Sequence, residues 1–134
     1  MIITEGTYVD KAEDVIKRIK KMVDQDRRKK MVTTSKMRNL LAMTSDIYNE
    51  VLNEQSDQLE ERLIERIEYL RIRFVYEAGR SSTDRNDTLK DLIEMSQILD
   101  ILKEINGSKK NFILFNRYVE ALVAFRKYYG GRDE

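Results

Sequence analysis

Apolar side chains recur three and four positions apart along most of the chain, a spacing that predicts amphipathic α-helices. The pattern predicts about five of them, over residues 7–23, 33–53, 59–80, 89–105 and 108–129. Residues suited to cap a helix N-terminus stand at these starts: Thr7 with Asp10, then Thr33, Thr34 and Ser35, then Ser56 or Asp57, then Asp87 or Thr88, and finally Ser108. Residues suited to end a helix follow three of the segments: Gly79, Asn106 with Gly107, and Gly130 with Gly131. We expect an all-α fold, a compact bundle of about five helices.

The segment over residues 59–80, LEERLIERIEYLRIRFVYEAGR, has apolar positions on two faces. One face is an ordinary core stripe, made of Leu59, Leu63, Ile67, Leu70 and Phe74. The second stripe lies on the opposite side and consists of Tyr69, Ile72 and Tyr76. A helix that is apolar almost all round is usually surrounded by other helices. The pattern therefore predicts that this segment is the central helix of the bundle.

The composition supports a purely helical domain. The chain has 134 residues, no proline and only five glycines, and 37% of its residues are charged. Residues that supply the turns of a multistranded sheet are therefore scarce. The length fits one domain. We expect a single helical-bundle domain over residues 1–134, with a basic loop at residues 24–32 between the first two helices.

Cysteine and histidine are both absent from the sequence. Their absence excludes disulfides and thiolate metal sites, and it removes the commonest general base and the usual zinc ligand. The glutamates of residues 60–68 share one side of a helix with Arg62 and Arg66, which fits exposed ion pairs better than a catalytic acid and base. We expect no catalytic activity, no metal and no cofactor.

Two further features bear on location. The first residues, MIITEGTYVD, contain no basic segment leading into an apolar one, so no secretory signal is visible. The longest apolar run, residues 121–125, falls far short of the ~20 residues that span a bilayer. We expect a soluble, cytoplasmic protein.

The net charge is only +1, but the charge is unevenly distributed. Residues 17–38 hold ten Lys or Arg and two Asp, a local charge of +8, whereas residues 46–68 hold eight acidic residues and two Arg, a local charge of −6. Residues 107–132 hold six basic residues and one Glu, a local charge of +5. Patches of this size suit either a polyanion or a second copy of the chain, basic patch against acidic patch.

Several cations are candidates to contact phosphate. The cluster in the basic loop is either a solubilising linker or a phosphate-contacting arm. Lys36 and Arg38 lie in the first turn of a helix, where the dipole disfavours cations unless an anion binds; a plain Ser/Thr cap is the other interpretation of this helix start. Arg73 and Arg80 are expected near the outside. The candidate set is Arg27, Arg28, Lys29, Lys30, Lys36, Arg38, Arg73 and Arg80.

Arg71 and Arg126 differ because they fall on or beside apolar faces. We expect their stems to lie along the core, with each guanidinium paired with a helix end or with a glutamate such as Glu77 or Glu120. The aromatic residues also fall mostly at core spacing. Tyr128 is the best placed of them to stack on a base instead.

Three blocks of the sequence resemble the small subunit of the type III-A CRISPR interference complex, the Csm effector. They are TTSKMRNLL at 33–41, YLRIRFVYEAGR at 69–80 and RYVEALVAFRKYYGG at 117–131. Their order and separation match as well, and the resemblance extends from about residue 31 to the end. The first 30 residues are similar only loosely.

The resemblance implies a helical bundle with no catalytic activity. It implies several copies stacked along the complex, lining the groove where CRISPR RNA pairs with target RNA. The implied contacts run to the sugar–phosphate backbone, without sequence specificity. The implied partners are CRISPR RNA, target RNA, the backbone and large subunits of the Csm complex, and other copies of the chain.

A second hypothesis from a different class stays open. The chain could be a purely protein-binding helical scaffold, whose charges select its partners and which makes no direct contact with RNA. Salt-sensitive RNA binding by the protein, alone or in its complex, distinguishes the two.

Overall fold

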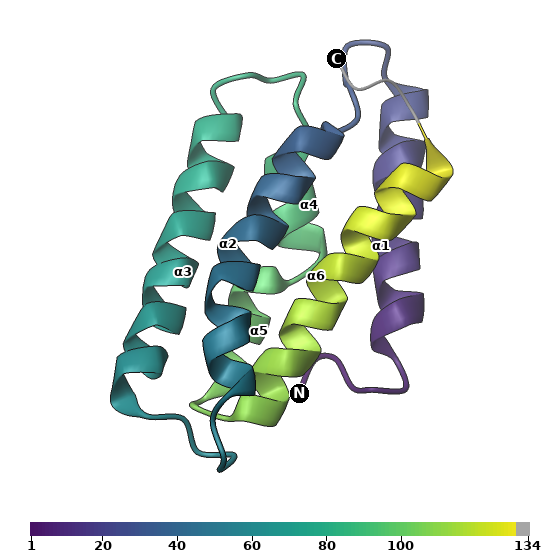
Figure 1. Cartoon of the computed structure of the whole chain (residues 1–134). Helices are drawn as coiled ribbons and strands as arrows, with labels where there is room; N and C mark the ends of the chain where they lie inside the picture. Colours follow the sequence, from purple (N-terminus) through teal and green to yellow (C-terminus); the bar gives the residue numbers. More distant parts are fainter. Residues whose placement is uncertain (131–134) are drawn as a thin grey trace.

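The computed structural model describes residues 1–130 and folds them into six α-helices (Figure 1). These are α1 (Tyr8–Gln25), α2 (Thr34–Leu52), α3 (Glu61–Ser81), α4 (Leu89–Met95), α5 (Ile98–Ile105) and α6 (Lys109–Tyr129). Within this range, pairing of the β type is limited to one isolated bridge between Gln58 and Ser108. The predicted all-α class is confirmed. None of the helices in residues 1–130 is long and apolar enough to cross a membrane.

α6 is the helix around which the others pack. It contacts α1, α2 and α5, and in Figure 1 it runs between α2 and α1. Three of its large aromatic side chains, Phe112, Phe115 and Tyr118, are fully buried. The Phe115 ring also reaches α3, where its centroid lies 6.3 Å from that of Phe74. Because aromatic rings bury the most apolar surface per residue, these contacts make α6 the centre of the core.

The prediction that the helix over residues 59–80 is central is wrong. α3 lies at one edge of the bundle (Figure 1) and packs against α2, α4 and α5. The face predicted as core is buried, but the second stripe is not: Tyr69, Ile72 and Tyr76 are 60%, 62% and 63% exposed. The aromatic helix α6 occupies the centre, so α3 has only one side to bury among the described residues.

The helix predicted over residues 89–105 is two helices, because the chain changes direction at Gln97. Gln97 has a φ of 60°, in the left-handed region that a right-handed helix cannot continue through. Next to it, the carbonyl of buried Ser96 accepts a 2.9 Å hydrogen bond from the Tyr118 hydroxyl of α6. The break lets α4 pack on α1 and α3 while α5 packs on α3 and α6.

Two of the predicted helix starts are confirmed in detail. The hydroxyls of Thr33 and Ser108 accept hydrogen bonds from backbone N–H groups in the first turns of α2 and α6. At α1 the prediction is wrong, because the Thr7 hydroxyl makes no capping hydrogen bond. It accepts a hydrogen bond from the backbone N–H of Thr4 instead, at 2.9 Å.

The start of α3 also differs from the prediction. Its N-cap is Glu60, and neither Ser56 nor Asp57 caps it. The Asp57 carboxylate serves α6 instead: Oδ1 accepts from the Lys110 backbone N–H and Oδ2 from the Ser108 hydroxyl, each at 2.9 Å. A carboxylate at a helix N-terminus satisfies free N–H groups and complements the helix dipole. The turn before α3 is thereby fastened to the start of α6.

The predicted helix ends are confirmed for α5 and α6. Asn106 and Gly107, which follow α5, have φ values of 47° and 75°, and Gly130 after α6 has a φ of 75°. Gly79 does not end α3 as predicted, because the helix continues through it in right-handed geometry. Gly131 lies outside the described residues.

Replacing Asp57 by Asn should lower the thermal unfolding midpoint near neutral pH. The Lys110 N–H and the Ser108 hydroxyl hold the pKa of Asp57 below its ordinary value of 3.8, so the carboxylate stabilises the fold above that pH. Its contribution is lost as the pH falls through the lowered pKa. Circular dichroism melts of both proteins should show a gap that is full above pH 3.8 and closes below it. A gap that does not depend on pH would assign the effect to shape alone.

Replacing Gln97 by Gly should stabilise the fold by up to about 1 kcal/mol, because glycine adopts left-handed φ without steric cost. Replacing Gln97 by Val should destabilise it by a similar amount or more, because a β-branched residue tolerates that region poorly. Urea titrations of the two variants give the free energies of unfolding. A destabilised glycine variant would show that packing of the glutamine side chain outweighs the backbone effect.

Candidate nucleic-acid interface

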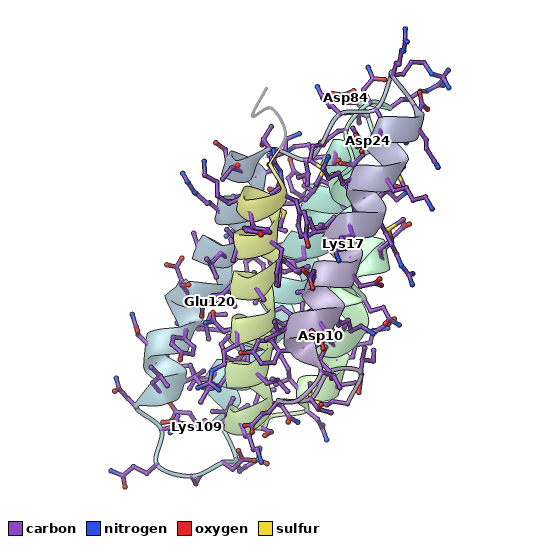
Figure 2. All side chains as sticks on the ribbon, turned by 90° about the vertical axis from the view of Figure 1, so that its right-hand side faces the viewer. Asp10, Lys17, Asp24, Asp84, Lys109 and Glu120 are labelled. Atoms are coloured by element: carbon purple, nitrogen blue, oxygen red, sulfur yellow. The ribbon has the colours of Figure 1, made fainter. Side chains whose placement is uncertain are left out.

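Two loops meet at one end of the bundle: the basic loop between α1 and α2, and the loop between α3 and α4. The backbone N–H of Lys30 donates to the Asn86 carbonyl at 2.8 Å, and the Thr88 hydroxyl donates to the Lys30 carbonyl at 3.0 Å. Figure 2 shows Asp24 and Asp84, which come from these two parts of the chain, at the same end of the molecule. The basic loop is therefore fastened to the α3–α4 loop.

Five of the eight candidate cations pair with acids of the same chain. The pairs are Arg28–Asp26 at 3.2 Å, Lys29–Asp91 at 3.9 Å, Lys30–Asp84 at 3.0 Å, Arg80–Glu77 at 2.9 Å, and Lys36–Asp87. The hydrogen bond from Lys30 holds the pKa of Asp84 below its ordinary value, and Asp84 in turn raises the pKa of Lys30. Exposed pairs of this kind contribute little to stability. They do reduce the positive charge that this end of the bundle presents to a polyanion.

The pair between Lys36 and Asp87 has a different character, because the Asp87 side chain is only 2% exposed. Asp87 Oδ2 bonds the Lys36 ammonium and accepts from the Ser81 hydroxyl at 2.9 Å, while Oδ1 accepts from the Leu89 backbone N–H at 3.3 Å. A buried carboxylate needs such partners, because desolvation makes an unpaired charge costly. Thr33 caps the same helix start. Lys36 and the cap are thus engaged within the chain.

Three candidate cations are exposed and lack an ion pair or hydrogen bond within residues 1–130: Arg27, Arg38 and Arg73. Arg27 lies in the basic loop and Arg38 on the outer side of α2. Arg73 lines a groove of about 340 Å³ between α2 and α3, together with Tyr69 and Arg66. The candidates therefore occupy three places: the end of the bundle, the outside of α2 and the α2–α3 groove.

The expectations for Arg126 and Arg71 are met in different ways. Arg126 is 1% exposed, and its Nε and Nη1 donate to the carbonyls of Val32 and Gly130 at 2.6 Å and 2.9 Å. Its guanidinium thus joins the end of α6 to the strand of chain that leads into α2. Arg71 is one-third exposed and pairs with Glu68 at 2.9 Å, so its partner is neither of the glutamates suggested by the sequence.

The sequence did not single out two exposed cations of α6, Arg117 and Lys127, which have no ion pair within the described residues. They were part of the positive charge counted over residues 107–132. Their spacing with exposed Ala124, at seven and three residues, could have placed them on one helix face. Tyr128, 78% exposed, extends the same outer side and lies off the core as expected.

The acidic part of α3 shows the expected surface pairing. Arg62 pairs with Glu50 at 3.0 Å and with Glu60 at 2.8 Å, and Arg66 pairs with Glu50 as well. Among residues 1–130, no group of three or more acidic side chains is arranged to hold a metal ion. The positive charges and the grooves beside them are therefore the features of this surface that suit a polyanionic ligand.

Comparisons with known proteins connect this surface to a family. The model of the Csm2 type III-A family matches residues 9–132. A protein of Streptococcus thermophilus described as "CRISPR system Cms protein Csm2" is 42% identical over 132 residues, covering 98% of both chains. Proteins of the same description from Mycobacterium tuberculosis (strain ATCC 25618 / H37Rv) and Enterococcus italicus are 32% and 34% identical, covering all of both chains and 88% of this chain with 86% of the relative, respectively.

Replacing Lys36 by Met should lower the free energy of unfolding by roughly 1–3 kcal/mol, because buried Asp87 loses its charge partner. Arg38→Met is the matched control, two positions along the same helix, and should change stability by about 0.5 kcal/mol or less. Urea titration measures both.

The pairing has a second test, in which Lys36→Met is combined with Asp87→Asn. The double variant should recover part of the loss, because no charge is then left unpaired. Equal stability of the Lys36 and Arg38 variants would show that the pair contributes nothing.

Proposed function

The chain belongs to the Csm2 family, the small subunits of type III-A CRISPR complexes, and we propose that it grips the sugar–phosphate backbone of target RNA and of the CRISPR RNA–target duplex. In this proposal the protein reads no bases, because sequence is read by pairing between the two RNAs. It breaks no bonds itself. Several copies line up along the complex and share the RNA, next to the backbone and large subunits.

The observation that carries the proposal is the set of exposed arginines without an acid partner. Arg38 and Arg73 have guanidinium groups that no carboxylate of the described chain neutralises. A guanidinium matches the oxygens of a phosphate in two parallel hydrogen bonds. Because no internal pair has to break first, these two side chains can bind phosphate at the lowest cost.

The remaining candidates are ranked by what they already contact. Arg27 is unpaired, so it joins Arg38 and Arg73. Arg28, Lys29, Lys30 and Arg80 are auxiliary contacts, since each exchanges an exposed carboxylate partner for a phosphate. Lys36 comes last, because its ammonium compensates a buried carboxylate.

Two features support a subunit without catalytic chemistry. The sequence contains neither histidine nor cysteine, so it lacks the commonest general base and the thiol nucleophile. The folded chain instead offers rigid helices that display charge. Alignment of several copies fits this role, because weak phosphate contacts on linked copies add up to tight binding.

The proposal predicts that Arg38→Gln with Arg73→Gln weakens retention of target RNA by assembled Csm complexes. Each lost phosphate contact should reduce the slope of log affinity against log salt by ~0.7 for a single strand. Filter binding across a salt series measures both quantities. The matched control is Arg18→Gln with Lys21→Gln, two exposed cations of α1, which packs against α6 and α4; it should leave the slope unchanged.

Three outcomes decide between the alternatives. A reduced slope for the Arg38 and Arg73 variant alone supports the assignment of these residues. Equal slopes for both variants contradict that assignment while leaving RNA binding in place. Absence of RNA binding by the unaltered protein, both alone at low salt and in the complex, favours the protein-binding scaffold instead.

A further inference from the structure

The outer face of α3 carries an apolar stripe that no described part of the chain covers. Its members are Tyr69, Ile72, Val75 and Tyr76, which are 60%, 62%, 52% and 63% exposed. A whole aromatic side chain contributes about 150–250 Å², so these four side chains present on the order of 400 Å² of apolar surface. A patch of that size on one helix is more than the scattered apolar residues of an ordinary surface, and it indicates a contact site. In Figure 1 the stripe belongs to the helix at the edge of the bundle.

The charges on either side of the stripe have opposite signs. Exposed Glu61, Glu65 and Glu68 come before it along α3, and exposed Arg73 and Arg80 lie within and after it. Glu61, Glu65 and Arg73 have no ion pair within the described residues. α3 is therefore acidic toward its N-terminus and basic toward its C-terminus around an apolar middle.

We propose that the free protein pairs with a second copy of itself through this face, with the two α3 helices antiparallel about a twofold axis. An antiparallel arrangement brings the acidic part of each helix to the basic part of the other, whereas a parallel one sets like charges together. If Tyr69 of one copy lies opposite Ile72 of the other, the opposed numbering sets Glu68 opposite Arg73 and Glu61 opposite Arg80. One register thus matches the apolar residues and both charge pairs.

The shape of the surface next to the stripe accommodates such a partner helix. Ile72 and Val75 also line a hollow between α3 and α5, together with Leu99. A helix packed 8–10 Å away, the usual interaxial distance, buries side chains in a groove of this kind. The apolar surface of the stripe thus continues into the hollow beside it.

The size of the contact predicts a weak pair. Two copies that each contribute on the order of 400 Å² of apolar surface bury about 800 Å², below the ~1,200 Å² of standard interfaces. Association in the micromolar range follows. The twofold axis closes the pair, since neither copy keeps a free α3 face for a third. This pair is therefore distinct from the open row of copies proposed for the complex, and it forms without RNA.

The test is sedimentation equilibrium of the full chain without RNA, across the micromolar range. The unaltered protein should show a monomer–dimer equilibrium. Ile72→Glu should raise the dissociation constant by at least about tenfold, since it puts a charge in the apolar middle. Val9→Glu is the matched control, an equally apolar exposed residue on α1 (44% exposed), and should leave the constant unchanged. Circular dichroism verifies that both variants keep the helical content and melting point of the parent.

A charge exchange tests the register. Glu68→Arg alone and Arg73→Glu alone should each weaken the pair, because each sets like charges opposite one another. An equal mixture of the two variants should associate again as a mixed dimer, in which both charge pairs are restored. A protein that stays monomeric throughout, equal effects of Ile72→Glu and Val9→Glu, or a mixture that stays monomeric would each overturn the proposal. None of these results bears on RNA binding in the complex.

Discussion

Burial of α6 is the constraint on which the rest of the structure depends. Its aromatic side chains fill the space between α1, α2 and α5, and Phe115 reaches α3 as well. Arg126 joins its end to the segment before α2, and Asp57 joins its start to the turn before α3. Once this helix takes the centre, α3 is left at the edge. The apolar residues on the outer side of α3 then face outward, which makes them available to another protein.

The overall class could be predicted from the sequence because the helical spacing and the lack of proline leave few alternatives. The centre of the bundle could not. An apolar stripe on two faces of a helix has the same spacing whether the second face meets a neighbour in the same chain or a different molecule, as at Ile72. α6 was underrated for the opposite reason, because Asn116 and Arg126 interrupt its apolar arc although both are buried.

The candidate site was predicted in outline and changed by pairing. Spacing and composition identify which residues carry positive charge, but not which acids the fold brings beside them. Lys36 and Asp87 lie 51 residues apart, and their contact follows from the meeting of α2 with the α3–α4 loop. By contrast, Arg38 has no acid beside it, so its charge stays available at the surface. The sequence alone gives no means to tell these two lysine and arginine positions apart.

The left-handed turn at Gln97 has a consequence for how the length of this chain can vary. No spare residue separates α4 from α5, and each residue of a helix turns its successors by about 100°. One inserted or deleted residue at this junction would rotate Ile98, Ile101 and Leu102 away from the interior that they now fill. The exposed segment at residues 82–86 has no such restriction over most of its length. Natural variation in length between α3 and α6 should therefore collect before α4 and avoid the junction after it.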